Sequence, residues 1–223
     1  MTSAASAAGS DLTVRLQKLY SAAVHDVLRA RGAGPFVLPD TLRPLDPARK
    51  LAGPVWTFSG RNDPTASAHD TLLAWTTMLS KAPAEHVIVC QPHNNDIALM
   101  GELSAETLQQ RRTLGYLADG GCRDTDYILA LGYPVFHRFF TPTDIVGRWV
   151  AGAFGEPIRI GSVDIHSGDY LLGDRDGVVV IPQAIAADVI AETEQVTNTE
   201  SQVRAATRAG TDPVEAYLKY GKF

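Results

Sequence analysis

An arginine and an aspartate, Arg123 and Asp124, are adjacent and follow the turn-forming stretch at residues 119–121 after one intervening residue. The guanidinium of an arginine is a planar fork of N–H donors that matches a carboxylate. The carboxylate of an aspartate is a hard oxygen ligand suited to Mg²⁺ or Mn²⁺. A 2-oxo acid presents a carboxylate beside a carbonyl, so a cation and a metal side by side would hold both groups and polarise the carbonyl. The pair is therefore a candidate site for a metal-assisted reaction of a small 2-oxo acid.

A second candidate lies upstream, where the turn Gly101-Glu102-Leu103-Ser104 opens a predicted helix. The first N–H groups of a helix have no partner within it and bind anions, including carboxylates. Each piece also has an ordinary structural explanation. An Arg-Asp pair after a strand is most often a surface ion pair or a helix cap, and the helix dipole favours an acid such as Glu102 at a helix start. The spacing of these residues alone therefore proves little.

The elements around the two candidates indicate how they are positioned. Ligands of open α/β sheets bind beyond the carboxyl ends of strands, which is where the loop before Arg123 begins. Short β-branched or apolar runs predict strands, and apolar residues at helical spacing predict helices. The predicted strands near the candidates are 85–90, 114–118 and 134–139, and the predicted helices are 67–80, 104–112 and 124–131.

Alternation of strands and helices predicts an α/β fold with a parallel or mixed sheet. A helix is predicted over 12–31, a strand over 51–58 with Pro54 at an edge or a bend, and a long helix over 183–208. The β-rich block at 147–182 is expected to form a second sheet layer, with strands at 157–160, 162–165, 170–173 and 177–181. Residues 11–223 are expected to be one domain with helices at both ends, and residues 1–10 a disordered tail.

Composition excludes several classes of function. The chain has 223 residues, a net charge of −5 and no cluster of Lys and Arg, so nucleic acid and anionic membranes are not expected partners. No apolar run reaches the ~18 residues needed to span a bilayer. Cys90 and Cys122 have no zinc-binding spacing and form no disulfide framework. These features predict a cytoplasmic protein.

The stretch GELSAETLQQRRTLGYLADGGCRDTDYI, followed by GYPVF, resembles the core of the RraA-like family. That family includes class II pyruvate aldolases acting on 4-hydroxy-4-methyl-2-oxoglutarate and 4-carboxy-4-hydroxy-2-oxoadipate. Its signature is an acidic residue, twenty residues and then Arg-Asp, the spacing of Glu102 to Arg123 here. SAAVHDVL, LAGPVWTF and SGDYLLGDRDGVVVIP are similar to further family motifs, so the resemblance covers roughly residues 15–205.

The resemblance implies a role for each matching residue. Asp124 would bind a divalent metal, Mg²⁺ or Mn²⁺, and Glu102 would hold its water molecules. Arg123 would bind the substrate and the developing enolate oxygen, while the N–H groups from Gly101 through Leu103 to Ser104 would receive the pyruvyl carboxylate. A glutamate from a neighbouring subunit is also implied, for which Glu200 is the candidate. The family further implies a layered β/β/α, swivelling-domain-like fold and a homotrimer or homohexamer.

Two departures and one alternative qualify the functional expectation. Tyr127 stands where the family often has an acid, and His137-Arg138-Phe139 replaces the usual residues after PVF. Both changes concern the substrate more than the metal site. The expected activity is a lyase that cleaves a C–C bond in a 2-oxo acid through a metal-stabilised enolate, with oxaloacetate decarboxylation allowed by the same chemistry. The alternative is a non-catalytic regulator that binds ribonuclease E, as some RraA-like proteins do.

Overall fold

The computed structural model describes the backbone of residues 2–223, and the side chains from residue 9 onward except that of residue 10. Its centre is a curled, mixed sheet in the order β1-β6-β4-β3-β2-β11-β12, with β8 also paired to β2. Strands β2, β3, β4 and β6 run parallel to one another, whereas β1, β8, β11 and β12 pair antiparallel with their neighbours. The strands of this sheet are β1 (Arg43–Pro44), β2 (Leu51–Asn62), β3 (Val87–Gln91), β4 (Gly115–Ala118), β6 (Val135–His137), β8 (Trp149–Gly152), β11 (Tyr170–Gly173) and β12 (Val178–Ile181).

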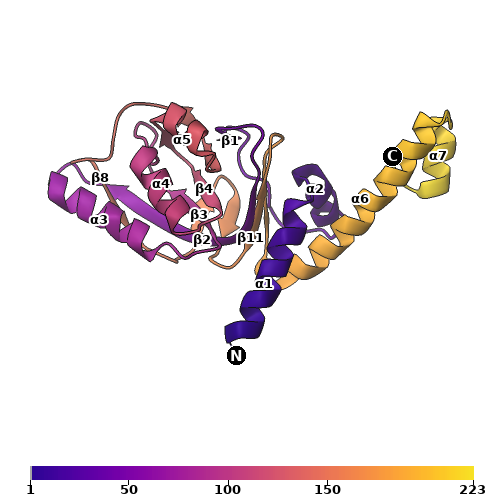
Figure 1. Cartoon of the computed structure of the whole chain (residues 1–223), viewed down its shortest axis with the longest axis horizontal. Coiled ribbons are helices and arrows are strands. Elements are labelled where there is room, and N and C mark those ends of the chain that lie inside the picture. Colours follow the sequence, from indigo (N-terminus) through magenta and orange to yellow (C-terminus); the bar gives the residue numbers. More distant parts are fainter. Residues whose placement is uncertain (1) are drawn as a thin grey trace.

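Two pairs of strands lie outside this sheet, and the helices form two groups (Figure 1). The small pairs are the antiparallel β9 (Ile158–Ile160) with β10 (Val163–Ile165), and the parallel β5 (Gly121–Cys122) with β7 (Phe139–Phe140). One helix group is α3 (Ala68–Lys81), α4 (Glu102–Gln110) and α5 (Thr125–Leu131). The other is α1 (Thr2–Gln17), α2 (Ser21–Ala30) and α6 (Ala186–Arg208), which follows the short 3-10 helix η1 (Gln183–Ile185) and leads to α7 (Pro213–Tyr220).

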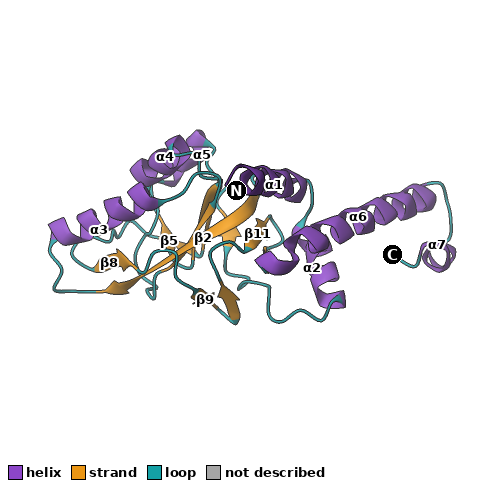
Figure 2. Cartoon of the chain, turned by 90° about the horizontal axis from the view of Figure 1, so that it is seen from below, coloured by secondary structure: helices purple, strands orange, loops and turns teal. Residues whose placement is uncertain are grey.

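The layers follow from the alternation of side chains along the strands. Val87 and Val89 of β3 point to the inner face of the curled sheet, where the β9–β10 hairpin covers them. Ile88 and Cys90 point to the opposite face, against α3, α4 and α5. A hairpin, a sheet and a helix layer are thus stacked in that order, which confirms the expected β/β/α architecture. The second helix group packs against β2, β11 and β12 through a further apolar cluster (Figure 2).

The predicted helix over 12–31 is wrong as a single element, because the chain turns between α1 and α2. Tyr20 is extended, and the Asp174 carboxylate accepts hydrogen bonds from both the N–H and the hydroxyl of Ser21, at 2.7 Å each. The apolar spacing continues across the turn, so the sequence pattern alone did not reveal it. Residues 2–10, expected as a tail, belong to α1, in keeping with an alanine-rich sequence of high helix propensity; Met1 lies outside the described residues.

The β-rich block at 147–182 is divided between two layers instead of forming one. Strands β8, β11 and β12 join the main sheet, and only β9 and β10 form the second layer. Pro54 lies inside β2 where its pairing with β11 ends and its pairing with β3 begins, so it is in an interior strand and not at an edge of the sheet. The neighbouring Gly53 has φ +151°, a conformation that side chains disfavour. Among the described residues, no helix has the length and apolar character needed to cross a membrane.

Candidate active site

Two loops are held together at the carboxyl end of the parallel strands. The segment after β3 pairs with β5 through a bridge between Ala98 and Gly121, reinforced by the Leu99 N–H donating to the Gly121 carbonyl at 2.9 Å. The N–H of Arg123 donates to the Met100 carbonyl at 2.9 Å. This backbone pairing places the start of α4 beside the Arg-Asp pair. The sequence candidates, which have twenty residues between them, are therefore neighbours in space.

Asp124 has a left-handed backbone, with φ 54° and ψ 37°. Asp and Asn tolerate this conformation better than most residues. Although Asp124 occupies the N-cap position of α5, its side chain does not cap that helix. Its Oδ2 instead accepts the N–H of Glu102 at 3.2 Å, so the carboxylate caps the first turn of α4. The backbone of Asp124 therefore begins α5 while its side chain caps α4, and these two constraints fix the orientation of the carboxylate.

Gly101 is the residue that allows this close approach. A Cβ at this position would lie 2.6 Å from Asp124 Oδ2 and 3.3 Å from Arg123 Nε, distances at which either side chain would have to move. Gly101 is also the N-cap of α4 and has no side chain with which to cap it. The N–H groups of Leu103 and Ser104, in the first turn, therefore depend on partners outside the helix. A bound carboxylate is such a partner.

Arg123 lies between two acids. Its Nε is 3.4 Å from Asp124 Oδ2, and its Nη1 is 3.7 Å from Asp144 Oδ2. The three side chains are between 34% and 42% exposed, so these ion pairs contribute little to stability, and their main effect is to orient the guanidinium. Sequence reasoning missed Asp144, because it lies in the loop after β7 and has no fixed spacing to the Arg-Asp motif.

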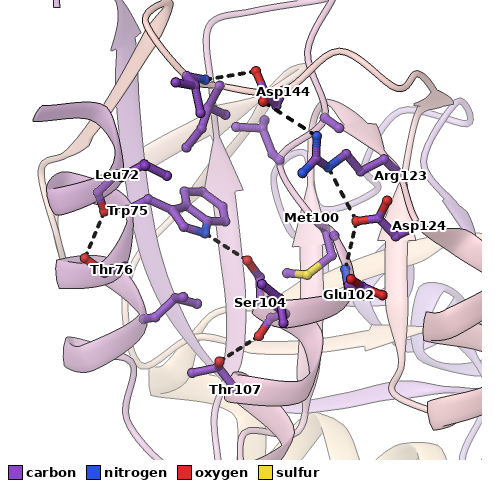
Figure 3. A pocket seen from close by; sticks show the side chains of 17 residues that line it. Leu72, Trp75, Thr76, Met100, Glu102, Ser104, Thr107, Arg123, Asp124 and Asp144 are labelled. Atoms are coloured by element: carbon purple, nitrogen blue, oxygen red, sulfur yellow. Dashed lines mark hydrogen bonds and ion pairs between the residues drawn. The ribbon is translucent and has the colours of Figure 1, made fainter. Parts of the chain in front are cut away.

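These charged residues stand at one end of a cavity of about 340 Å³ (Figure 3). Helix α3 forms the opposite wall, which the sequence did not assign to a site. The apolar and uncharged residues that line the cavity include Leu72, Trp75, Thr76, Leu79, Met100, Ser104, Thr107, Ile145 and Val146. The cavity is large enough for a small organic acid, and its two ends differ in chemistry.

The donor set of this site fits a hard divalent cation. Glu102, Asp124 and Asp144 all supply carboxylates to the cavity. In the described part of the chain no three His, Cys, Asp or Glu side chains are close enough to form a complete ligand set. Mg²⁺ is typically held by only one or two carboxylates, with water and substrate oxygens completing its shell. The described residues give Asp124 Oδ1 no hydrogen-bond partner, so this oxygen is the one suited to such an ion.

Glu200 is on α6, which runs out from the body of the molecule toward α7 (Figure 1), and it does not line this cavity. Its Oε2 accepts the Tyr20 hydroxyl, and its Oε1 is 3.4 Å from Lys222 Nζ. Burial, and then the hydrogen bond to Glu200, raise the pKa of Tyr20 to about 12, so the phenol stays protonated as the donor. Whether Glu200 reaches the site of a neighbouring subunit stays a prediction, since one chain is described.

The two departures from the family pattern do not line the cavity. Tyr127 is on the surface of α5 and is 69% exposed. His137 is buried, with its ring centroid 4.4 Å from that of Phe140 and its Nδ1 3.2 Å from the Phe139 carbonyl oxygen. Burial lowers the pKa of His137, so it is a neutral, structural histidine at pH 7.

Comparison with known proteins gives consistent matches. The chain is 26% identical over 213 residues to the protein DlpA of Legionella pneumophila, covering 94% of this chain but only about a third (34%) of that protein. It is also 26% identical over 183 residues to a protein of Halalkalibacterium halodurans named as a candidate 4-hydroxy-4-methyl-2-oxoglutarate aldolase, covering 82% of each.

A solved structure has the same fold. Streptomyces coelicolor RraAS2, described as an unusual member of the RNase ES inhibitor RraA protein family, matches with a TM-score of 0.76 at 23% identity, over 87% of this chain and 96% of that one. At this identity the likeness concerns the fold alone. The family model described as RraA-like, Aldolase/RraA, matches residues 6–180. With most of its length matched, the chain belongs to the RraA-like family.

Proposed function

We propose that this protein is a divalent-metal-dependent lyase of the class II pyruvate aldolase type, which cleaves a C–C bond in a small 2-oxo acid. One observation carries the proposal: Arg123, Asp124 and the N-terminus of α4 meet at one end of a cavity of about 340 Å³. The name of the Halalkalibacterium halodurans relative supports the same class of reaction.

Substrate binding uses the charged end of the cavity. The carboxylate of the 2-oxo acid accepts hydrogen bonds from the N–H groups of Leu103 and Ser104, where the positive end of the α4 dipole favours an anion. The guanidinium of Arg123, oriented by Asp124 and Asp144, points its remaining N–H groups at the 2-oxo oxygen. Mg²⁺ or Mn²⁺ on Asp124, with water molecules held by Glu102, would supply a Lewis acid for that oxygen.

Cleavage follows from this placement. The C4 hydroxyl loses its proton and becomes a carbonyl as the C3–C4 bond breaks, and the bonding electrons pass to the C2 oxygen as an enolate. Arg123 stabilises the negative charge that develops on this oxygen. We assign proton transfer to Glu102, acting through water, and a proton returned to C3 gives pyruvate. Loss of CO₂ from oxaloacetate leaves the same enolate, so decarboxylation is a second expected activity.

The test is release of pyruvate from 4-hydroxy-2-oxo acids, measured with a coupled dehydrogenase. We expect activity with Mg²⁺ or Mn²⁺, loss with a chelator and recovery when the metal is restored. Arg123→Lys keeps the charge but loses the fork, and we expect it to lower kcat by about 100-fold. Arg112→Lys is the matched control, because the Arg112 side chain is 78% exposed and its ion pair among the described residues is with Glu85, at 3.5 Å. Equal activity of both variants would refute the site assignment.

The fold of RraAS2 supports one other candidate, a regulator that binds ribonuclease E. Such a protein needs a complementary surface and no reaction at Arg123. Its test is a pull-down with ribonuclease E, alongside the pyruvate assay. Binding without pyruvate release would replace the lyase proposal with this one.

A further inference from the structure

The wall of the cavity opposite Arg123 is apolar. One stripe of α3, made of Leu72, Trp75, Thr76 and Leu79, faces the cavity at the helical spacing of three and four residues (Figure 3). Ile145 and Val146, after the loop that carries Asp144, continue the same wall. A ligand held by its carboxylate at the charged end would extend toward these side chains.

Three polar side chains that line the cavity, two on α3 and one on α4, already donate their hydrogens within the protein. The indole N–H of Trp75 donates to Ser104 Oγ at 2.9 Å. The hydroxyl of Thr76 donates to the Leu72 carbonyl at 2.8 Å, and that of Thr107 to the Leu103 carbonyl at 2.6 Å. These three groups therefore have no hydrogen left to donate to an anionic substituent. For a substrate, this wall behaves as an apolar surface.

The charges of the residues that line the cavity also favour an uncharged substituent on the substrate. Among the described residues that line it, Arg123 is the single cationic side chain, against the carboxylates of Glu102, Asp124 and Asp144. Arg123 and the metal proposed on Asp124 are both committed to the 2-oxo acid end, so a second carboxylate on the substrate would find no further cation on this chain to pair with. Burying an unpaired charge costs far more than burying an apolar group, and like charges add repulsion.

We propose that the substrates are 4-hydroxy-2-oxo acids whose C4 substituent is uncharged and apolar. This inference rests on the proposed function and specifies the substrate class of the same site. Cleavage of R–CHOH–CH₂–CO–COO⁻ breaks the C3–C4 bond and gives R–CHO and pyruvate. The proton that leaves the C4 hydroxyl balances the proton gained at C3. The apolar group R contacts Leu72, Trp75 and Val146 throughout the reaction.

The experiment compares two substrates of matched shape. In 4-hydroxy-6-methyl-2-oxoheptanoate the C4 substituent is isobutyl, and in 4-hydroxy-2-oxoadipate a carboxymethyl group of similar size replaces it. We expect kcat/KM to be about 10- to 100-fold higher for the isobutyl substrate. Equal values, or a preference for the adipate, would overturn the proposal even if no variant could be purified.

A pair of variants on α3 sharpens the test. Thr76→Arg places a cation on the wall and should lower the isobutyl preference by about tenfold. Thr77→Arg is the matched control, because Thr77 makes the same kind of hydroxyl bond, to the Leu73 carbonyl at 2.7 Å, but does not line the cavity. An unchanged preference in folded Thr76→Arg protein, or an equal change in both variants, would contradict the proposal.

A third measurement separates failure of this inference from failure of the proposed function. Exchange of the pyruvate methyl protons for deuterium, followed by NMR with Mg²⁺ present, needs only the charged end of the cavity. Exchange without a preference for the isobutyl substrate would reject the apolar substrate class alone. Absence of both exchange and pyruvate release would reject the lyase.

Discussion

Asp124 and Glu200 are two carboxylates in similar surroundings. Each lies 3.4 Å from a cationic nitrogen, of Arg123 in one case and Lys222 in the other. Each also borders a hollow in the surface. The difference is in their oxygens. Both carboxylate oxygens of Glu200 have a partner, one in Tyr20 and the other in Lys222. In Asp124, Oδ2 accepts a hydrogen bond from the N-terminus of α4, whereas Oδ1 has no hydrogen-bond partner among the described residues. A carboxylate next to a cation therefore indicates a ligand-binding site only when one of its oxygens has no partner within the protein and can bind a ligand.

Removing the charge of Asp124 should have the largest effect. Asparagine tolerates the left-handed backbone at this position, so Asp124→Asn changes the ligand without straining the loop. We expect pyruvate release to fall by about 100-fold or more, while the melting temperature changes by about 2 °C or less. Coupled assays and thermal unfolding measure the two quantities. If Asp124→Asn retains half of the activity, the carboxylate of Asp124 is not required for the reaction, and the contrast drawn with Glu200 fails.

Gly101→Ala tests whether the backbone sets the carboxylate. The added Cβ would lie 2.6 Å from Asp124 Oδ2 and displace it, and we expect a loss of about 10- to 100-fold in kcat/KM. Gly152→Ala is the control, since a Cβ on Gly152 meets no atom within 4 Å. We expect the control to keep full activity. If the two variants behave alike, the close approach at Gly101 has no catalytic meaning.

Glu200→Gln tests whether the carboxylate of Glu200 contributes to activity. Glutamine keeps the shape of the side chain and can still accept the Tyr20 hydroxyl, so activity stays within about threefold of the original if Glu200 acts only within its own chain. A loss near 100-fold with unchanged melting would instead show that Glu200 serves the site of a neighbouring subunit. Light scattering on the same sample checks the expected three or six subunits.

The smallest effect concerns the attachment of the C-terminus near Glu200. Lys222 Nζ lies 2.9 Å from Asp26 Oδ2, and this contact lowers the pKa of Asp26 below its usual 3.8. A lowered carboxyl pKa stabilises the fold above the unfolded pKa, and this stabilisation is lost as the pH falls through the folded value. Protection of the C-terminal Phe223 from a carboxypeptidase should therefore stay constant from about pH 8 to pH 5.

Asp26→Asn removes the ion pair at every pH, and we expect trimming of Phe223 to accelerate by about two- to fivefold without a change in pyruvate release. The control is Asp164→Asn, whose exposed partner Arg159 lies in the β9–β10 hairpin, 3.6 Å away. Trimming that depends on pH in this range, or that is equal in both variants, would show that the ion pair does not hold the C-terminus.

Local patterns predicted much of this molecule. The strands predicted at 85–90 and 114–118 are β3 and β4, and the helix predicted at 67–80 is α3, because short apolar runs and helical spacing depend on residues close in sequence. The break between α1 and α2 was not predictable in that way. It depends on Asp174, which is 153 residues from Ser21 and lies in the turn between the paired strands β11 and β12.

The candidate site divides in the same manner. The sequence by itself identified Glu102, Arg123 and Asp124 as candidates, because residue types and their spacing can be read from the sequence alone. Only the tertiary structure decided that the stripe of α3 at Leu72, Trp75 and Leu79 faces a cavity, because the spacing of an apolar helix face is the same whether it meets the core or a ligand. Tertiary structure likewise brought Asp144 to Arg123, since the position of a loop after β7 depends on the packing around it.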